Sequence, residues 1–151
     1  MNTLKQILKS YYGYHSFPPM QEEIIRHTIE GGDSLVLMPT GGGKSLCFQI
    51  SALVMEGMEV IVSPLISLMK DQVGALKANG IAAEALNSSN DEGLNRDIIN
   101  RCLEGKVKLL YISPSTLYLQ LGTRFPTRIY AVGRAPRTVP RSTHYGAHGY
   151  C

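Results

Sequence analysis

The stretch Met38-Pro-Thr-Gly-Gly-Gly-Lys-Ser45 constrains the fold of this chain more than any other part of the sequence. It follows a short apolar run, residues 35–37, that predicts a buried strand, and it precedes residues 46–55, whose length and composition favour a helix. Consecutive glycines let the backbone turn with positive φ and bring N–H groups close to phosphate oxygens, while a helix start adds its dipole. The sequence therefore predicts a phosphate-binding loop between a strand and a helix.

Two side chains at the end of this loop suit a nucleoside triphosphate. Lys44 can reach the β- and γ-phosphates, and the Ser45 hydroxyl can bind Mg²⁺. The usual motif has a glycine at the position of Met38, so this loop is a variant. The alternative is a glycine-rich connection without function, and the Lys-Ser pair at the helix start argues against it. The predicted nucleotide-binding residues are Thr40, Gly41, Gly42, Gly43, Lys44 and Ser45.

Strand-like and helix-like patterns alternate along the first 114 residues. Strands are predicted at 35–37, 59–63, 81–86 and 107–113, and helices over a short opening segment ending near Gly13, then at 22–29, 46–55, 65–77 and from about Glu92 onward. Such alternation predicts an α/β domain with a mostly parallel sheet, whose ligands bind at the carboxyl ends of the strands. Those ends carry the glycine loop, Ser63-Pro64, Asn87-Ser88 and Ser113-Pro114.

The loop upstream of the phosphate loop has residues that can recognise a base. The Gln21 amide can pair with a donor and an acceptor on an adenine edge, and the Tyr14 ring can stack on the base. By itself, Gln21 also fits the first turn of a helix, because two glutamates follow it.

Composition favours a globular protein, with 44% hydrophobic and 18% charged residues. No apolar run approaches the about 20 residues of a membrane span, and the N-terminus lacks a signal-peptide core. Three widely separated cysteines, Cys47, Cys102 and Cys151, argue against a disulfide framework, and Cys47 is expected to pack in the core. We expect a cytoplasmic protein without a membrane partner.

Residues 4–114 resemble the first motor domain of the RecQ family of ATP-dependent DNA helicases, in superfamily 2. The runs that carry the resemblance are Tyr14 to Ile25, Met38 to Gln49, Val62 to Val73 and Leu110 to Pro114. The second and third runs are long and highly specific together.

This resemblance implies a P-loop NTPase fold of the RecA-like type, ATP and Mg²⁺ as cofactors, and 3′ to 5′ movement along single-stranded DNA. It implies a location in a bacterial cytoplasm or nucleoid, and roles in DNA repair and recombination. Adenine recognition falls on Tyr14 to Gln21 and nucleotide binding on Thr40 to Ser45. Contacts with the DNA backbone are expected from Ser63, Pro64, Ser67, Lys70, Asn87 and Ser113.

Two departures from the family pattern limit what carries over. The family usually has an arginine that packs on adenine where this chain has Pro18, so adenine affinity is expected to be weakened. The resemblance also stops after Pro114, before the Asp-Glu-Ala-His box whose carboxylates hold Mg²⁺ and activate water. No Asp or Glu follows Glu104. We therefore divide the chain into a partial ATP-binding motor domain, 1–114, and an irregular basic tail, 115–151.

Charge separates these two parts. Residues 1–115 hold 10 Lys and Arg against 12 Asp and Glu, a net charge of −2, whereas 116–151 hold five arginines and no acid. Three interpretations of the tail remain open. It is a frameshifted replacement of the true continuation, a basic arm that binds nucleic acid, or a metal site. The candidate ligands of that metal site are His144, His148 and Cys151.

Three functions follow as hypotheses. The first is the ATP-binding portion of a RecQ-like helicase that binds nucleotide but, as this chain alone, hydrolyses ATP inefficiently and does not unwind DNA. The second is a non-catalytic module that binds ATP and nucleic acid. The third, a small-molecule kinase, is disfavoured because residues 63–72 match a motor motif and provide no substrate pocket.

Overall fold

The structure is a computed structural model that describes residues 3–38, 43–120, 127–131 and 148–149, with side chains as far as residue 119. Within these ranges, no helix has the length and apolar character needed to cross a membrane.

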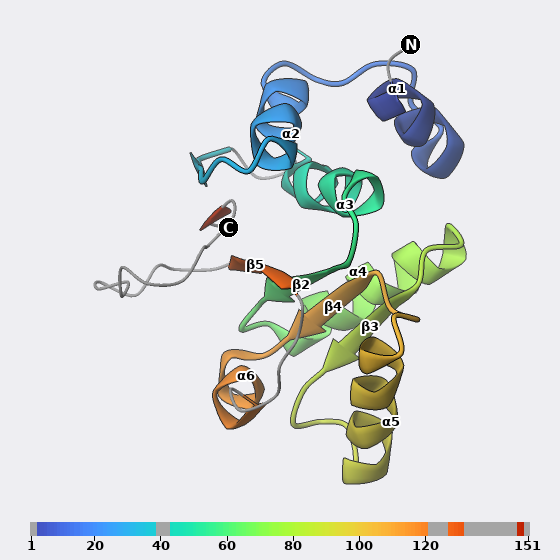
Figure 1. Cartoon of the computed structure of the whole chain (residues 1–151), viewed down its shortest axis with the longest axis vertical. Helices are drawn as coiled ribbons and strands as arrows, with labels where there is room; N and C mark the ends of the chain where they lie inside the picture. Colours follow the sequence, from blue (N-terminus) through green and yellow to red (C-terminus); the bar gives the residue numbers. More distant parts are fainter. Residues whose placement is uncertain (1–2, 39–42, 121–126, 132–147, 150–151) are drawn as a thin grey trace.

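A four-stranded parallel sheet lies at the centre of the fold (Figure 1). Its strands are β2 (Met58–Val62), β3 (Ala83–Leu86), β4 (Leu109–Ile112) and β5 (Thr127–Ala131), arranged in the order β3-β4-β2-β5. Parallel neighbours need crossover connections, and α4 (Ile66–Ala78) and α5 (Glu92–Leu103) supply them between β2, β3 and β4. The predicted α/β fold and three of the predicted strands are confirmed.

Alternate residues of the strands face two helical layers. On one face, Ile61 of β2 and Tyr111 of β4 pack with α4 and with α3 (Lys44–Val54). On the other face, Val60 and Ile112 pack with α5, and Leu117 of α6 (Pro114–Gln120) adds to the same cluster. Figure 1 shows α3 on one side of the sheet and α5 and α6 on the other. The sheet is therefore enclosed between two helical layers.

The N-terminal helices pack on α3 rather than on the sheet. They are α1 (Thr3–Ile7), which continues as one π-helical turn, Leu8–Tyr12, and α2 (Gln21–Ile29). Leu8 and Ile25 are fully buried against Cys47 and Ile50 of α3. Cys47 thus packs in the core, as predicted, and the opening helix ends at Gly13, where φ is +74°.

β1 (Leu35–Val36) departs from the prediction of a buried strand. It pairs in parallel with β6 (His148–Gly149), outside the four-stranded sheet. The side chains of Leu35 and Leu37 are 63% and 75% exposed. Apolar character predicts a strand here, and the strand exists. Its burial was predicted wrongly, because burial depends on which elements cover the strand.

The segment after residue 114 also differs from the expectation of irregular structure. Pro114 predicts the end of a strand, but it is also the first residue of α6, where a missing N–H leaves no hydrogen bond unmade. The Ser113 hydroxyl accepts a hydrogen bond from the N–H of Thr116 over 3.3 Å, as a capping side chain does. Residues 114–120 are helical and 127–131 form β5, so irregular structure was wrongly predicted for both segments.

Candidate functional site

Lys44 is the first residue of α3 and closes the glycine loop. Its Nζ donates a hydrogen bond to the carbonyl oxygen of Met38 over 2.9 Å, so the lysine bridges the loop from one end to the other. Gly43 caps the helix with φ +71°, a backbone conformation that glycine adopts without strain. Thr40, Gly41 and Gly42 lie outside the described residues.

The N-terminus of α3 fits an anion. Its first turn has no acidic side chain to neutralise the positive end of the helix dipole, and Lys44 and Ser45 are both half-buried there. These residues fit a phosphate group, and the Ser45 hydroxyl can contribute one oxygen to Mg²⁺. Across the described residues, no group of three or more His, Cys, Asp or Glu side chains could hold a metal ion. The side chains of His144, His148 and Cys151 lie outside that part of the chain.

Gln21 lies directly against the end of the glycine loop. The residue is fully buried at the start of α2, and its Nε2 donates to the carbonyl oxygen of Gly43 over 3.2 Å. The sequence singled out this amide for adenine recognition, and the structure places it beside the loop that would hold the phosphates. Tyr14 is 58% exposed, which leaves its ring available for stacking.

The carboxyl ends of β3, β4 and β2 form a row of small polar residues. Leu86, Ile112 and Val62 are in register across these strands, so the residues that follow them, Asn87, Ser113 and Ser63, are neighbours in that order. All three are buried, at 1%, 5% and 2% exposure. The structure therefore brings together three residues for which the family resemblance implies contacts with the DNA backbone.

Each member of this row also orders the turn that follows it. The Ser63 hydroxyl accepts from the N–H of Leu65 at 3.3 Å, and Oδ1 of Asn87 accepts from the N–H of Ser89 at 2.9 Å. Nδ2 of Asn87 is buried and makes no hydrogen bond with the described residues. A buried donor of this kind usually has a partner. The other predicted DNA contacts, Pro64, Ser67 and Lys70, are exposed around the start of α4.

Sequence reasoning did not single out Gln49, which is buried and lies at the centre of a partly buried hydrogen-bond network. The available signal was one amide within the apolar helix that follows the loop.

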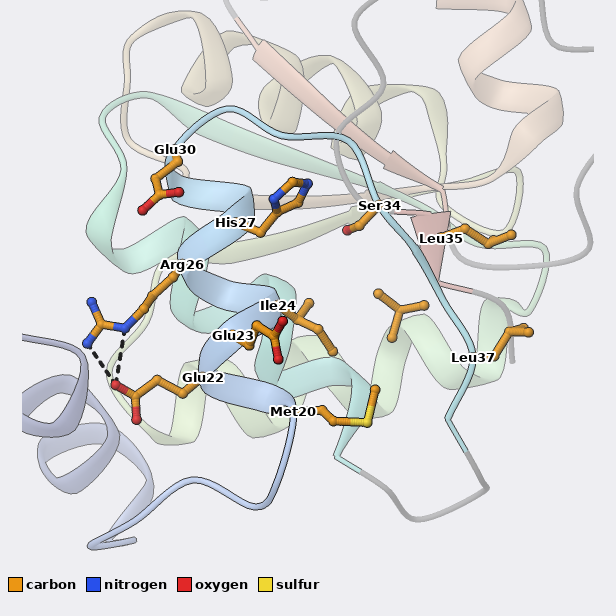
Figure 2. A pocket seen from close by; sticks show the side chains of 11 residues that line it. Met20, Glu22, Glu23, Ile24, Arg26, His27, Glu30, Ser34, Leu35 and Leu37 are labelled. Carbon is orange, nitrogen blue, oxygen red and sulfur yellow. Dashed lines mark hydrogen bonds and ion pairs between the residues drawn. The ribbon is translucent and has the colours of Figure 1, made fainter.

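A groove of about 700 Å³ lies between α2 and the segment around β1 (Figure 2). The residues that line it do not include Ser63, Asn87 or Ser113. Its wall carries Glu22 and Glu23 of α2 and Glu30 at the C-cap of that helix. Arg26 donates to Oε1 of Glu22 from Nε at 3.2 Å and from a terminal nitrogen at 2.7 Å. Three carboxylates make this groove unsuitable for phosphate. The groove is therefore a poor candidate for the nucleotide site.

A parallel α/β sheet with a lysine at the helix end of a glycine loop defines the P-loop NTPase class. A family model described as DEAD/DEAH box helicase matches residues 18–130, which is more than half of the chain. The chain therefore belongs to the DEAD/DEAH box helicase family. The match extends beyond residue 114 to β5.

Individual relatives refine this placement. The chain is 52% identical over 112 residues to the ATP-dependent DNA helicase RecQ of Haemophilus influenzae and 44% identical over 118 residues to RecQ of Bacillus subtilis. These alignments cover 74% and 78% of this chain but 18% and 20% of the relatives. The predicted resemblance to RecQ helicases is confirmed, and the chain spans about a fifth of the length of these relatives.

Solved helicase structures share the fold. The DUF1998 helicase MrfA bound to DNA and AMPPNP superposes with a TM-score of 0.72 at 14% identity, covering 88% of this chain and 21% of MrfA. A hypothetical ATP-dependent RNA helicase from Sulfolobus tokodaii gives a TM-score of 0.67 at 16% identity, covering 88% of this chain and 41% of that one. These likenesses confirm the RecA-like helicase fold.

Proposed function

We propose that this chain is the nucleotide-binding part of the first motor domain of a RecQ-like 3′ to 5′ DNA helicase, and that it binds ATP with Mg²⁺. The observation that supports nucleotide binding most directly is the position of Lys44 at the N-terminus of α3, bonded to one neutral carbonyl. Phosphate oxygens can replace that carbonyl, because an anionic acceptor attracts the Lys44 ammonium more strongly than a neutral carbonyl does.

The proposed nucleotide contacts divide by chemistry. Thr40 to Gly43 supply backbone N–H groups, Lys44 supplies the charge, and the Ser45 hydroxyl supplies an oxygen for Mg²⁺. Tyr14 stacks on the base, and Gln21 both holds Gly43 and reads the adenine edge. Pro18 provides no guanidinium, so the preference for adenine is modest.

The proposed DNA site is the row formed by Asn87, Ser113 and Ser63, continued by Pro64, Ser67 and Lys70 at α4. Hydroxyl and amide donors can hold a phosphate without reading a base, as movement along any sequence requires. The exposed Ser67 hydroxyl and Lys70 ammonium beside this row support the assignment, since both can contact a phosphate oxygen.

Hydrolysis is a separate matter. It requires carboxylates that fix Mg²⁺ and orient the attacking water, and no Asp or Glu follows Glu104 in this chain. We propose that the chain binds ATP without efficient hydrolysis. The same observation favours a second candidate, a module that binds ATP and nucleic acid without catalysis.

Two measurements on the 151-residue chain test these proposals. A titration with a fluorescent ATP analogue and Mg²⁺ should give saturable binding, and phosphate release should stay at background with and without oligo-dT. Absence of saturable binding overturns the nucleotide site. DNA-stimulated ATP turnover of about 1 s⁻¹ lies within the ordinary enzyme range. Such a rate would overturn the proposal that the chain lacks efficient hydrolysis, and it would exclude the non-catalytic module.

A further inference from the structure

A partly buried hydrogen-bond network connects α3, α4, β4 and the N-terminal helices. Gln49 lies at its centre and is 6% exposed. Its Oε1 accepts from the Tyr12 hydroxyl at 3.0 Å, and its Nε2 donates to Oε1 of Gln72 at 2.8 Å and to the Tyr111 hydroxyl at 3.3 Å. One amide thus bonds to three segments besides its own.

The network has a defined orientation. Both ends of the Gln49 amide are used, so rotating the amide by half a turn would place its nitrogen against the Tyr12 hydroxyl and its oxygen against Oε1 of Gln72, the acceptor that Nε2 now serves. Burial raises the pKa of Tyr12 to about 12 and also raises the pKa of Tyr111, so both hydroxyls keep their protons near neutral pH. The Tyr111 hydroxyl lies 3.5 Å from Oε1 of Gln72 and completes the ring.

Each residue of the network is close in sequence to a different part of the proposed site. Gln49 is one helical turn after Ser45 on the same face of α3, and Tyr12 precedes Tyr14 by two residues. Gln72 follows Lys70 on α4, and Tyr111 precedes Ser113 at the end of β4. The base, the phosphates and the DNA backbone would therefore contact segments that share one amide.

We propose that Gln49 is a positioning residue that couples nucleotide binding at the start of α3 to DNA binding at α4 and the end of β4. This inference rests on the proposed function. Phosphate bound at Lys44 and Ser45 acts on α3, and a buried amide cannot lose its partners without leaving them unsatisfied. Tyr111 is 2% exposed and must follow Gln49 or exchange partners, and half-buried Gln72 bonds to both residues. Either change reaches the segments that carry the proposed DNA contacts.

Coupling is measurable as a ratio of affinities. The dissociation constant of fluorescein-labelled oligo-dT is measured with and without Mg²⁺-AMPPNP, and the AMPPNP constant with and without oligo-dT. Linkage requires the same factor in both directions. We expect a factor of about 5 or more in the wild-type chain, the lower end of typical allosteric coupling. In Gln49→Met, which keeps the length of the side chain without its hydrogen bonds, we expect a factor below about 2.

A matched control separates coupling from the loss of any buried hydrogen bond. Ser51 is also buried on α3, but its hydroxyl bonds only within the helix, to the carbonyl of Cys47 at 2.7 Å. Ser51→Ala should keep the wild-type factor. Tyr111→Phe should lower it, and this milder change replaces Gln49→Met if circular dichroism shows that the methionine variant does not fold.

The possible outcomes separate a failure of this inference from a failure of the proposed function. Wild-type chain that binds neither ligand overturns both. If the wild-type chain binds both AMPPNP and oligo-dT but neither ligand changes the affinity for the other, the inference is overturned and the proposed function stands. An unchanged factor in folded Gln49→Met or Tyr111→Phe, or an equal loss of coupling in Ser51→Ala, also overturns the inference.

Discussion

Gln21 and Gly43 are in direct contact although 22 positions separate them in the sequence: Nε2 of Gln21 donates to the carbonyl oxygen of Gly43 over 3.2 Å. A Cβ atom at position 43 would overlap that nitrogen. Gly43 is therefore required for two reasons, its φ of +71° and the close approach of a buried side chain. The contact joins the start of α2 to the start of α3, so it fixes where the loop ends.

Gly43→Ala should be more destabilising than an alanine at another glycine of similar φ. Gly80 has φ +76° and open space around its Cα, so Gly80→Ala reports the backbone effect alone, about 1–2 kcal/mol. Gly43→Ala adds the overlap with Gln21, which we expect to contribute a further roughly 1–3 kcal/mol. Urea unfolding of both variants measures the difference. Equal losses would show that Gln21 moves away at no cost.

Lys44→Ala should remove most ATP binding and leave the fold intact. The Lys44 side chain is half-buried and bonded to one backbone carbonyl, so its loss affects the ligand more than the core. The missing charge-assisted contact should weaken ATP binding by about 1.5–3 kcal/mol. Nucleotide titration with circular dichroism as the fold control tests this. Equal affinity in the two proteins would contradict the assignment of the loop.

Local patterns predicted most of the helices and strands, because hydrophobic periodicity and helix-capping residues are features that span only a few positions. Asp91 illustrates this: its side chain caps α5 by accepting from the N–H of Leu94 at 2.8 Å, one residue before the predicted helix start at about Glu92. Pro114 was ambiguous, since the same residue can end a strand and begin a helix. The burial of Leu35 was predicted wrongly, because the environment of this side chain depends on strands far away in sequence.

The candidate site could be predicted in part. Ser63, Asn87 and Ser113 were identified individually, but only the strand order β3-β4-β2 shows that they form one row. The contacts of Gln21 with Gly43 and of Gln49 with Tyr12, Gln72 and Tyr111 join residues that no local pattern relates. Thr40 to Gly42 stay predictions, as does the role of Ser45 with Mg²⁺.

Met20→Gly should stabilise the chain. Met20 caps α2 with φ +69°, and it is the non-glycine residue with positive φ among the described residues. Glycine relieves this strain, and we expect a gain of about 1 kcal/mol in the free energy of unfolding. Met20 is 62% exposed, so little packing is lost. Met20→Ala is the control: it removes the same side chain, keeps the strained φ, and should give no gain in urea unfolding.

Alkaline pH should weaken the fold through Tyr12 and Tyr111. Burial raises the pKa of Tyr12 from 10.0 to about 12 and raises that of Tyr111 in the same direction. In the unfolded chain both groups lose their protons near pH 10, so the stability they contribute is present below pH 10 and lost as pH rises toward 12. Urea midpoints between pH 9 and pH 11.5 should fall less steeply in Tyr111→Phe than in wild type. Parallel curves would show that Tyr111 ionises normally.

Hydrogen exchange should separate β2 from β1. β2 lies between β4 and β5 and is covered by helices on both faces, whereas β1 has two residues and its Leu35 side chain is mostly exposed. Amides that open only on global unfolding exchange slowest, so we expect Val60–Val62 to be the slowest amides and Leu35–Leu37 to exchange much faster. Because residues 35–38 lead directly into the proposed phosphate-binding loop, bound ATP should protect them more than β2. Uniform protection across both strands without ligand would contradict the exposed position of β1, and ATP that protects β2 alone would argue against a phosphate site between Met38 and Lys44.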